Sequence, residues 1–299
     1  MSDAIALKHV AYRPAKEFAI RDLTMTVPSG AIYGFLGPNG SGKTTTIKLI
    51  LGMQDADNGL IEVLGHQIPQ GTPQALAHIG YVPEKVHLYG SLTVGEMMDY
   101  HRAFYATWDA TRANDLRRQF ALRTEQKIER LSKGEAGKLM MMLALATQPE
   151  LLVLDEPTDG LDPVVRRDVL SALVEYVSTR NATVLVSSHL VHEQERVCDW
   201  VGVMDGGSLI AEMPMNTFRS GIKRLRVSGA PPVLPAAPFT LLGRTATAGS
   251  EEEWGVRGWQ SDMGAWLTAQ GATLREVIDL DLEESFVELL STARTGGAA

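Results

Sequence analysis

The chain has 299 residues, of which 44% are hydrophobic and 21% charged, and its formal net charge is −8. This is the composition of a folded globular protein, and the acidic balance argues against nucleic acid as a partner. The single cysteine, Cys198, excludes an internal disulfide framework and favours a reducing compartment. The longest apolar run, 139–146, is too short to span a bilayer, and the first residues lack the pattern of a signal peptide, so we expect a soluble protein.

The first third of the chain predicts strands that lead into a glycine-rich loop. Residues 5–10 and 19–27 alternate apolar and polar side chains, which is typical of strands. The nearly continuous apolar run 31–36 predicts a buried parallel strand, and a helix is predicted at 45–51, directly after the loop. Residues 93–147 then have a helical pattern, and Thr93 begins it with the spacing of a capping box.

The middle of the chain predicts a second pair of buried strands. These lie at 151–154 and 183–186, and a helix from Pro163 to about Thr179 separates them, with Asp162 as its N-cap. A strand, a helix and a strand in this order predict a parallel pair with a right-handed crossover. Residues 201–210 predict a hairpin that turns at Asp205-Gly206-Gly207.

The composition changes after about residue 220, where prolines crowd one stretch. Strand-like segments and helices follow, at 239–242, 254–256, 261–270, 273–278 and 282–294. We therefore expect residues 221–299 to form a small accessory α+β domain.

The glycine-rich loop matches the pattern G-x-x-x-x-G-K-[ST]. Its residues are Gly37, Pro38, Asn39, Gly40, Ser41, Gly42, Lys43 and Thr44. Glycines permit positive φ, so successive N–H groups can face a phosphate, and the following helix adds the positive end of its dipole. Lys43 would reach the β- and γ-phosphates, and the Thr44 hydroxyl would bind Mg²⁺. A chance glycine turn is disfavoured because the loop lies between a buried strand and a helix. ATP with Mg²⁺ is the expected ligand.

Two carboxylates and a histidine follow the other buried strands. Asp155 and Glu156 end the strand at 151–154, and His189 follows the strand at 183–186. Ligands of parallel sheets bind beyond the carboxyl ends of the strands, so these side chains should lie beside the loop. Asp155 is suited to Mg²⁺, Glu156 to orienting or deprotonating the attacking water, and His189 to contact with the γ-phosphate. The alternatives are an acid pair at a helix N-terminus and a histidine without a catalytic role.

Together these motifs resemble the ATP-binding cassette (ABC) ATPases. The loop is similar to their Walker A motif, 151–156 to Walker B, Leu131-Ser132-Lys133-Gly134-Glu135 to the signature, 158–162 to the D-loop and His189 to the switch histidine. The resemblance covers residues 1–220 and implies the P-loop ABC ATPase fold, a mixed core sheet with helices and a helical subdomain at about 85–148.

The resemblance also implies partners and further site residues. It implies a head-to-tail homodimer, or a pseudo-dimer with a related ATPase, in which the signature of one chain completes the ATP site of the other. The nucleotide-binding set then also includes Thr45, Ser132, Gly134, Glu135 and Asp162. From the residues alone, Ser132 is an N-cap and Glu135 completes its capping box, which leaves an anion site at the start of that helix.

Three features depart from the commonest family pattern. The signature usually reads LSGGQ, so Lys133 replaces a glycine and Glu135 a glutamine; we expect Lys133 to compensate the carboxylate. Glu84 stands where a glutamine is usual and remains a candidate Mg²⁺ ligand, directly or through water. For the aromatic residue that stacks on adenine, Pro14 falls at the expected position and Tyr12 two residues earlier, so the assignment stays open.

The variant signature and the variant residue Glu84, with the segment 281–286, resemble an exporter branch whose ATPase chains pair with separate membrane subunits. The expected function is an ATP-hydrolysing subunit of an ABC transporter, cytoplasmic and held at the inner face of the membrane by integral membrane subunits. The segment from about Glu84 to Tyr105 would pass the movement to them. The alternative is a soluble ABC ATPase acting on DNA or the ribosome; the acidic balance and the lack of coiled coils or a second cassette disfavour it. A P-loop kinase would not need the signature or the D-loop.

Overall fold

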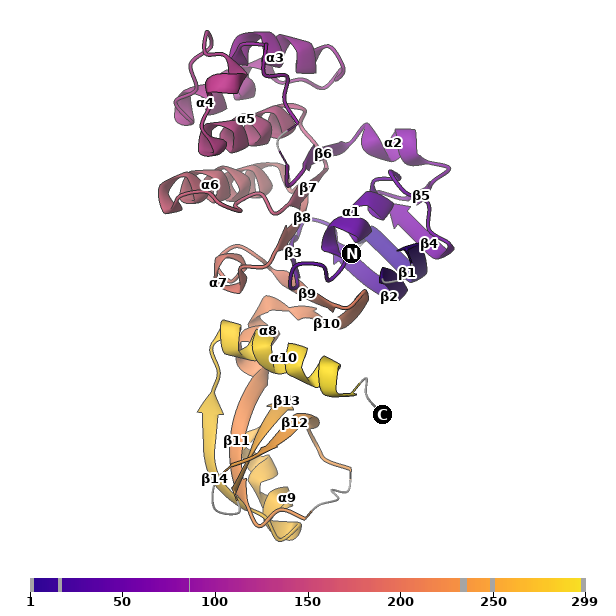
Figure 1. The fold of residues 1–299 in the computed structure, drawn as a ribbon, viewed down its shortest axis with the longest axis vertical. Helices are drawn as coiled ribbons and strands as arrows, with labels where there is room; N and C mark the ends of the chain where they lie inside the picture. Colours follow the sequence, from indigo (N-terminus) through magenta and orange to yellow (C-terminus); the bar gives the residue numbers. More distant parts are fainter. Residues whose placement is uncertain (1–2, 16–17, 86, 232–235, 248–250, 297–299) are drawn as a thin grey trace.

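The computed structural model describes residues 3–15, 18–85, 87–231, 236–247 and 251–296. Within them three sheets make up an elongated molecule together with the helices (Figure 1). Helices occupy one end, two sheets lie in the middle, and a third sheet lies at the other end.

The central sheet is mostly parallel, with the strand order β10-β9-β3-β8-β7-β6. Its strands are β3 (Ile32–Leu36), β6 (Ile79–Val82), β7 (Leu151–Asp155), β8 (Thr183–Ser188), β9 (Trp200–Asp205) and β10 (Ser208–Pro214). Every residue of β3, β7 and β8 is buried, which confirms the buried strands predicted from the continuous apolar runs. The strands β9 and β10 form the predicted antiparallel hairpin. Because β3, β7 and β8 are parallel neighbours, their carboxyl ends meet at one edge, where the glycine-rich loop begins.

A second, antiparallel sheet packs with one helix against the central sheet. It has the order β2-β1-β4-β5 and consists of β1 (Asp3–Ala15), β2 (Phe18–Pro28), β4 (Asn58–Val63) and β5 (His66–Ile68). Its buried face shares a core with Tyr33, Phe35 and α1 (Lys43–Ile50). The alternation of apolar residues predicted β1 and β2, whereas β4 to β6 and α2 (Thr72–Leu76) are short and were not predicted.

The helices are α3 (Val94–Arg102), α4 (Ala110–Gln119), the 3-10 turn η1 (Ile128–Arg130), α5 (Lys133–Ala146) and α6 (Pro163–Arg180). The capping boxes predicted at Thr93 and Ser132 are both present, and Asp162 accepts from the N–H groups of Val164 and Val165 as the predicted N-cap of α6. Figure 1 shows α3, α4 and α5 together at the end of the molecule farthest from the third sheet.

The third sheet has its own core. It has the order β12-β13-β11-β14 and consists of β11 (Ile222–Ser228), β12 (Thr240–Ala246), β13 (Glu251–Arg257) and β14 (Thr273–Asp279). Helix α9 (Gly264–Ala269) packs on it around the fully buried Trp254. The sequence did not predict the interior strand β11, because three of its seven residues are Lys or Arg.

The last helix, α10 (Leu282–Gly296), joins the third sheet to the rest of the molecule (Figure 1). Its side chains Phe286 and Leu289 belong to the same buried cluster as residues of the central sheet, α7 (Val191–Gln194) and α8 (Met215–Gly221). A helix that follows the accessory sheet in sequence therefore packs on the larger core.

Candidate functional site

The glycine-rich loop connects β3 to α1 in the manner that the sequence predicts. Gly40 and Gly42 have φ of 79° and 117°, in the region that favours glycine. At Gly42 an added Cβ would lie 2.7 Å from Met204 Cε and 2.8 Å from Ile20 Cδ1, so a side chain would also clash. Since α1 begins directly after Gly42, its N-terminus adds a positive dipole at the loop, which favours an anion.

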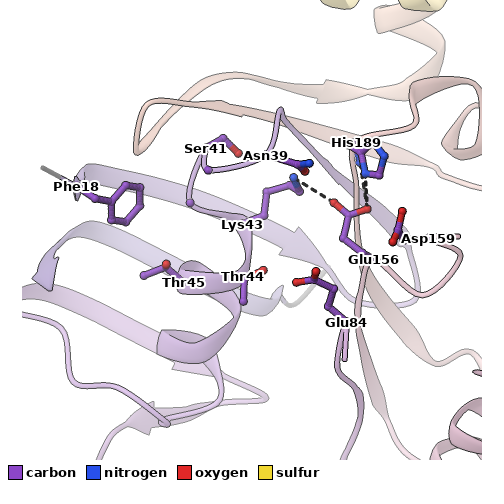
Figure 2. A pocket seen from close by; sticks show the side chains of 12 residues that line it. Phe18, Asn39, Ser41, Lys43, Thr44, Thr45, Glu84, Glu156, Asp159 and His189 are labelled. Atoms are coloured by element: carbon purple, nitrogen blue, oxygen red, sulfur yellow. Dashed lines mark hydrogen bonds and ion pairs between the residues drawn. The ribbon is translucent and has the colours of Figure 1, made fainter. Parts of the chain in front are cut away.

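An open cavity of about 580 Å³ lies against this loop. Its lining residues are Phe18, Asn39, Gly40, Ser41, Gly42, Lys43, Thr44, Thr45, Glu84, Glu156, Asp159 and His189. The fold thus brings residues from five separate segments of the chain to one place (Figure 2). Ten of the twelve were predicted as site residues from the sequence; Phe18 and Asp159 were not.

Lys43, Glu156 and His189 form a connected row inside the cavity (Figure 2). The Nζ atom of Lys43 lies 3.2 Å from Oε1 of Glu156, and Nδ1 of His189 lies 2.9 Å from Oε2. Lys43 also donates to the carbonyl oxygens of Gly37, at 2.7 Å, and Pro38, at 3.3 Å. Glu156 has φ of 49°, so the chain turns sharply as it leaves β7 and presents this carboxylate to the loop.

Asp155 lies behind the cavity and is 1% exposed. Its Oδ1 accepts from Ser187 Oγ at 2.7 Å, and the same hydroxyl accepts from the Glu156 N–H at 3.0 Å. Its Oδ2 is buried and has no hydrogen-bond partner in the described structure. A buried carboxylate oxygen without a partner is costly, so the site has an unused acceptor for a hydrated cation.

Thr44 and Glu84 bring two further side-chain groups with oxygen atoms to the cavity, on the side of the loop away from His189 (Figure 2). Within the described ranges no cluster of three or more His, Cys, Asp or Glu side chains could hold a metal alone. Mg²⁺ keeps several waters and shares phosphate oxygens, so a few scattered oxygen ligands beside a phosphate loop fit Mg-ATP. Burial, Asp155 and Glu84 together raise the pKa of the neighbouring Tyr81 to about 12, so its phenol stays neutral.

The predicted signature residues lie away from this cavity. Ser132 caps α5, and Glu135 Oε2 accepts from the Ser132 N–H at 2.8 Å and from its hydroxyl at 3.0 Å. The backbone hydrogen bond from Ser132 holds the pKa of Glu135 below its usual value. Gly134 packs against Val165 on α6, and Asp162 is occupied as the cap of that helix.

The Lys133 ammonium pairs with a residue of the loop after β7. Its Nζ atom lies 3.3 Å from Asp159 Oδ2, and Asp159 lines the cavity. The Glu135 carboxylate is held by the Ser132 backbone and hydroxyl.

Phe18 is the aromatic residue that the cavity contains. Pro14 is exposed on β1, and Tyr12 packs against the core of the antiparallel sheet. Phe18 begins β2, and its Cζ atom would lie 3.1 Å from a Cβ added to Gly42. Strand alternation could have indicated Phe18 from the sequence. Residues two apart in a strand face the same side, and Ile20, two residues after Phe18, also reaches Gly42.

Comparison with known proteins agrees with this geometry. Residues 20–159 match the model of the ABC transporter family. The chain is 34% identical over 209 residues to the ABC transporter ATP-binding protein YtrB of Bacillus subtilis, which covers 70% of this chain and 71% of that protein. It is 36% identical over 213 residues to the Nod factor export ATP-binding protein I of Burkholderia orbicola, with 70% of each chain covered.

A solved ATP-binding subunit of an ABC transporter is similar in structure, with a TM-score of 0.66 and 29% identity over 72% of this chain and 92% of that one. These comparisons support a transporter ATPase and not the alternative acting on DNA or the ribosome. In the part of the chain that the structure describes, no helix is long and apolar enough to cross a membrane. The chain belongs to the ABC transporter family, as an ATP-binding subunit that hydrolyses ATP to power transport.

Proposed function

We propose that this chain binds Mg-ATP between two copies of itself and uses hydrolysis to drive export through separate membrane subunits. The observation that carries the proposal is the row formed by Lys43, Glu156 and His189 in the cavity of the phosphate loop. In this row the Glu156 carboxylate lies within ion-pair distance of the Lys43 ammonium and within hydrogen-bond distance of the His189 imidazole.

Each part of the row has its own task. Residues 37–45 hold the β- and γ-phosphates. The backbone N–H groups of the loop donate to the phosphate oxygens, and the Lys43 ammonium offsets their negative charge. Glu156 orients and deprotonates the attacking water, and His189 contacts the γ-phosphate. Thr44, Asp155 and Glu84 hold Mg²⁺, directly or through water, and the metal supplies charge stabilisation for the phosphates.

The second copy supplies the signature. Ser132 and Lys133 are exposed, and the N-terminus of α5 is an anion site that lies outside the cavity of its own chain. A γ-phosphate from a partner can therefore meet Ser132, Gly134 and Glu135, and Asp162 lies at the start of the adjacent α6. A homodimer would bring the signature of one copy to the cavity of the other. A pseudo-dimer with a related ATPase would do so in the same way.

The membrane subunits dock on an aromatic surface formed by Tyr89, Tyr100 and Phe104. These side chains are 56%, 42% and 67% exposed, and their rings contact one another at 5.2 and 5.1 Å between centroids. Exposed aromatic rings in contact are typical of a protein interface. This surface lies on the segment that follows Glu84, a residue that lines the cavity, so a movement at the cavity can reach the membrane subunits through it. Binding to these subunits would hold the chain at the cytoplasmic face of the membrane.

We propose two functional units, an ATP-binding domain of residues 1–220 with a helical subdomain at about 85–148, and an accessory domain of residues 221–299. The third sheet with its own core supports this division, although α10 packs on the larger core. Export is supported by the name of the Nod factor export relative and by the variant residues of the signature.

Co-purification from membranes tests the proposal. The tagged chain should co-purify with an integral membrane protein, and Phe104→Asp should lose it while the isolated variant still hydrolyses ATP. Val287→Asp, at an exposed apolar residue of α10, is the matched control and should retain the partner. A chain that co-purifies with nucleic acid and never with a membrane protein would contradict the transporter role proposed here.

A further inference from the structure

Side-chain pairs continue the contact between β7 and β8 beyond the ends of these strands. The last paired residues of the ladder, Asp155 and Ser187, are joined by their side chains at 2.7 Å. Just beyond the ends of the two strands, the side chains of Glu156 and His189 are joined at 2.9 Å. The relative position of the two segments therefore sets where the proposed base and the imidazole stand.

A third pair lies farther out and does not line the cavity. The hydroxyl of Thr158 donates to Oε2 of Glu193 at 2.7 Å, and the two residues are 2% and 5% exposed. Thr158 belongs to the loop that follows Glu156, and Glu193 belongs to α7, the short helix that follows His189. This bond thus joins the same two segments that carry the base and the imidazole.

Glu193 has a second partner on α6, the helix that follows this loop. Its Oε1 lies 2.6 Å from Nη1 of Arg166, and Nη2 of Arg166 donates to the Leu161 carbonyl oxygen at 3.2 Å. A buried carboxylate is tolerated only with such partners, because leaving water is costly for an ionised group. Glu193 therefore contacts the loop 156–161 directly at Thr158, and at Leu161 through Arg166.

The helix that carries Glu193 is itself fixed. Val191 of α7 is 4% exposed and belongs to the main core, together with Phe286 and Leu289 of α10. Because α7 packs against the main core, the position of Glu193 is fixed, and its hydrogen bond to Thr158 restrains the loop 156–161.

We propose that Glu193 is a positioning residue for ATP hydrolysis. Through Thr158 and Arg166 it keeps the loop that carries Glu156 in register with the segment that carries His189. The inference rests on the proposed roles of Glu156 and His189. Nucleotide binding depends on the separate segment 37–45, so a loosened loop 156–161 should slow hydrolysis and leave affinity for ATP nearly unchanged.

The test compares two substitutions at Thr158 in the full chain. Thr158→Val removes the hydroxyl and should lower kcat by about tenfold, with the KM for ATP within about twofold of wild type, since a shift of about 1 Å at a reacting group can cost more than that. Thr158→Ser keeps the donor and should restore most of kcat. Glu193→Gln keeps an acceptor for Thr158 and leaves Arg166 without its counter-charge. The kcat of this variant should therefore lie between the values for Thr158→Val and Thr158→Ser.

Two controls make the result specific. Tyr176→Phe removes another buried hydroxyl bond, to the Pro149 carbonyl oxygen at 2.9 Å, at the opposite end of the sheet. It should lower the melting temperature and leave kcat unchanged. Rates are measured well below the melting temperature of each variant, so that unfolding does not contribute.

Several outcomes would overturn the inference. These are an unchanged kcat in Thr158→Val, an equal loss in Thr158→Ser, or the same loss in Tyr176→Phe. Glu156→Gln is measured in the same assay. If that variant is inactive while Thr158→Val is normal, only the role of Glu193 fails. If Glu156→Gln hydrolyses ATP at the wild-type rate, the proposed base fails and the positioning role fails with it.

Discussion

Lys43 and Glu156 form an ion pair across the cavity, with 3.2 Å between Nζ and Oε1 and side chains that are 5% and 11% exposed. The cation of the phosphate loop is therefore paired with the carboxylate that we propose as the base. A γ-phosphate entering the loop competes with Glu156 for Lys43, since both are anions. ATP binding and the release of the base are thus coupled through one lysine.

Lys43→Ala should weaken ATP binding roughly tenfold to a hundredfold, because a hydrogen bond to a charged group contributes about 1.5–3 kcal/mol. Titration with a fluorescent ATP analogue measures the change. Lys48→Ala, at the other end of α1, is the control and should bind normally. Wild-type affinity in Lys43→Ala would contradict the assignment of the loop.

Glu156→Gln should bind ATP but lose turnover by about a hundredfold or more, in the range typical of a general base. Gel filtration with ATP should show a trapped dimer, because binding proceeds and reopening does not. Glu150→Gln, just before the start of the same strand, should hydrolyse ATP normally; its carboxylate is exposed and pairs with His78. Normal turnover in Glu156→Gln would remove this residue from the role of base.

Ser132→Arg should block ATP-driven dimerisation while each monomer still binds ATP, because it places a long side chain where a partner's phosphate would meet α5. Ser132→Ala separates this effect from the loss of the helix cap, which costs about 1 kcal/mol. Ser178→Arg, at the exposed far end of α6, should dimerise as the wild type does. Analytical ultracentrifugation with and without ATP measures the fraction of dimer. An ATP-dependent dimer of Ser132→Arg would contradict the proposal that the signature of one copy completes the ATP site of the other.

Phe18→Ala should weaken the binding of ATP roughly tenfold and the binding of inorganic triphosphate much less. The reason is that stacking of a base on an aromatic ring contributes about 1–3 kcal/mol. Competition against the same fluorescent analogue compares the two ligands. Phe104→Ala, an exposed aromatic residue away from the cavity, should change neither affinity. An equal loss for both ligands would argue against stacking by Phe18.

The sequence predicted local elements well where each one has a continuous pattern. The apolar runs before Gly37, Asp155 and Ser187 are buried parallel strands, and the caps at Ser132 and Asp162 are where their spacing places them. These features depend on neighbours within one or two turns of chain, so their period is visible in the residues. The interior strand β11 was missed because its pattern is diluted by charges that pair with other strands and with α10.

By itself, the sequence determined the chemistry: a phosphate loop at 37–44, the acid pair Asp155 and Glu156, and a histidine after a buried strand. Only the tertiary structure decided which partners these groups meet. It placed Phe18 in the cavity, paired Lys133 with Asp159, and joined Glu193 to Thr158. The physical reason is that such pairs join residues distant in the chain, and their meeting depends on strand order and on which faces are buried together, which no local period records.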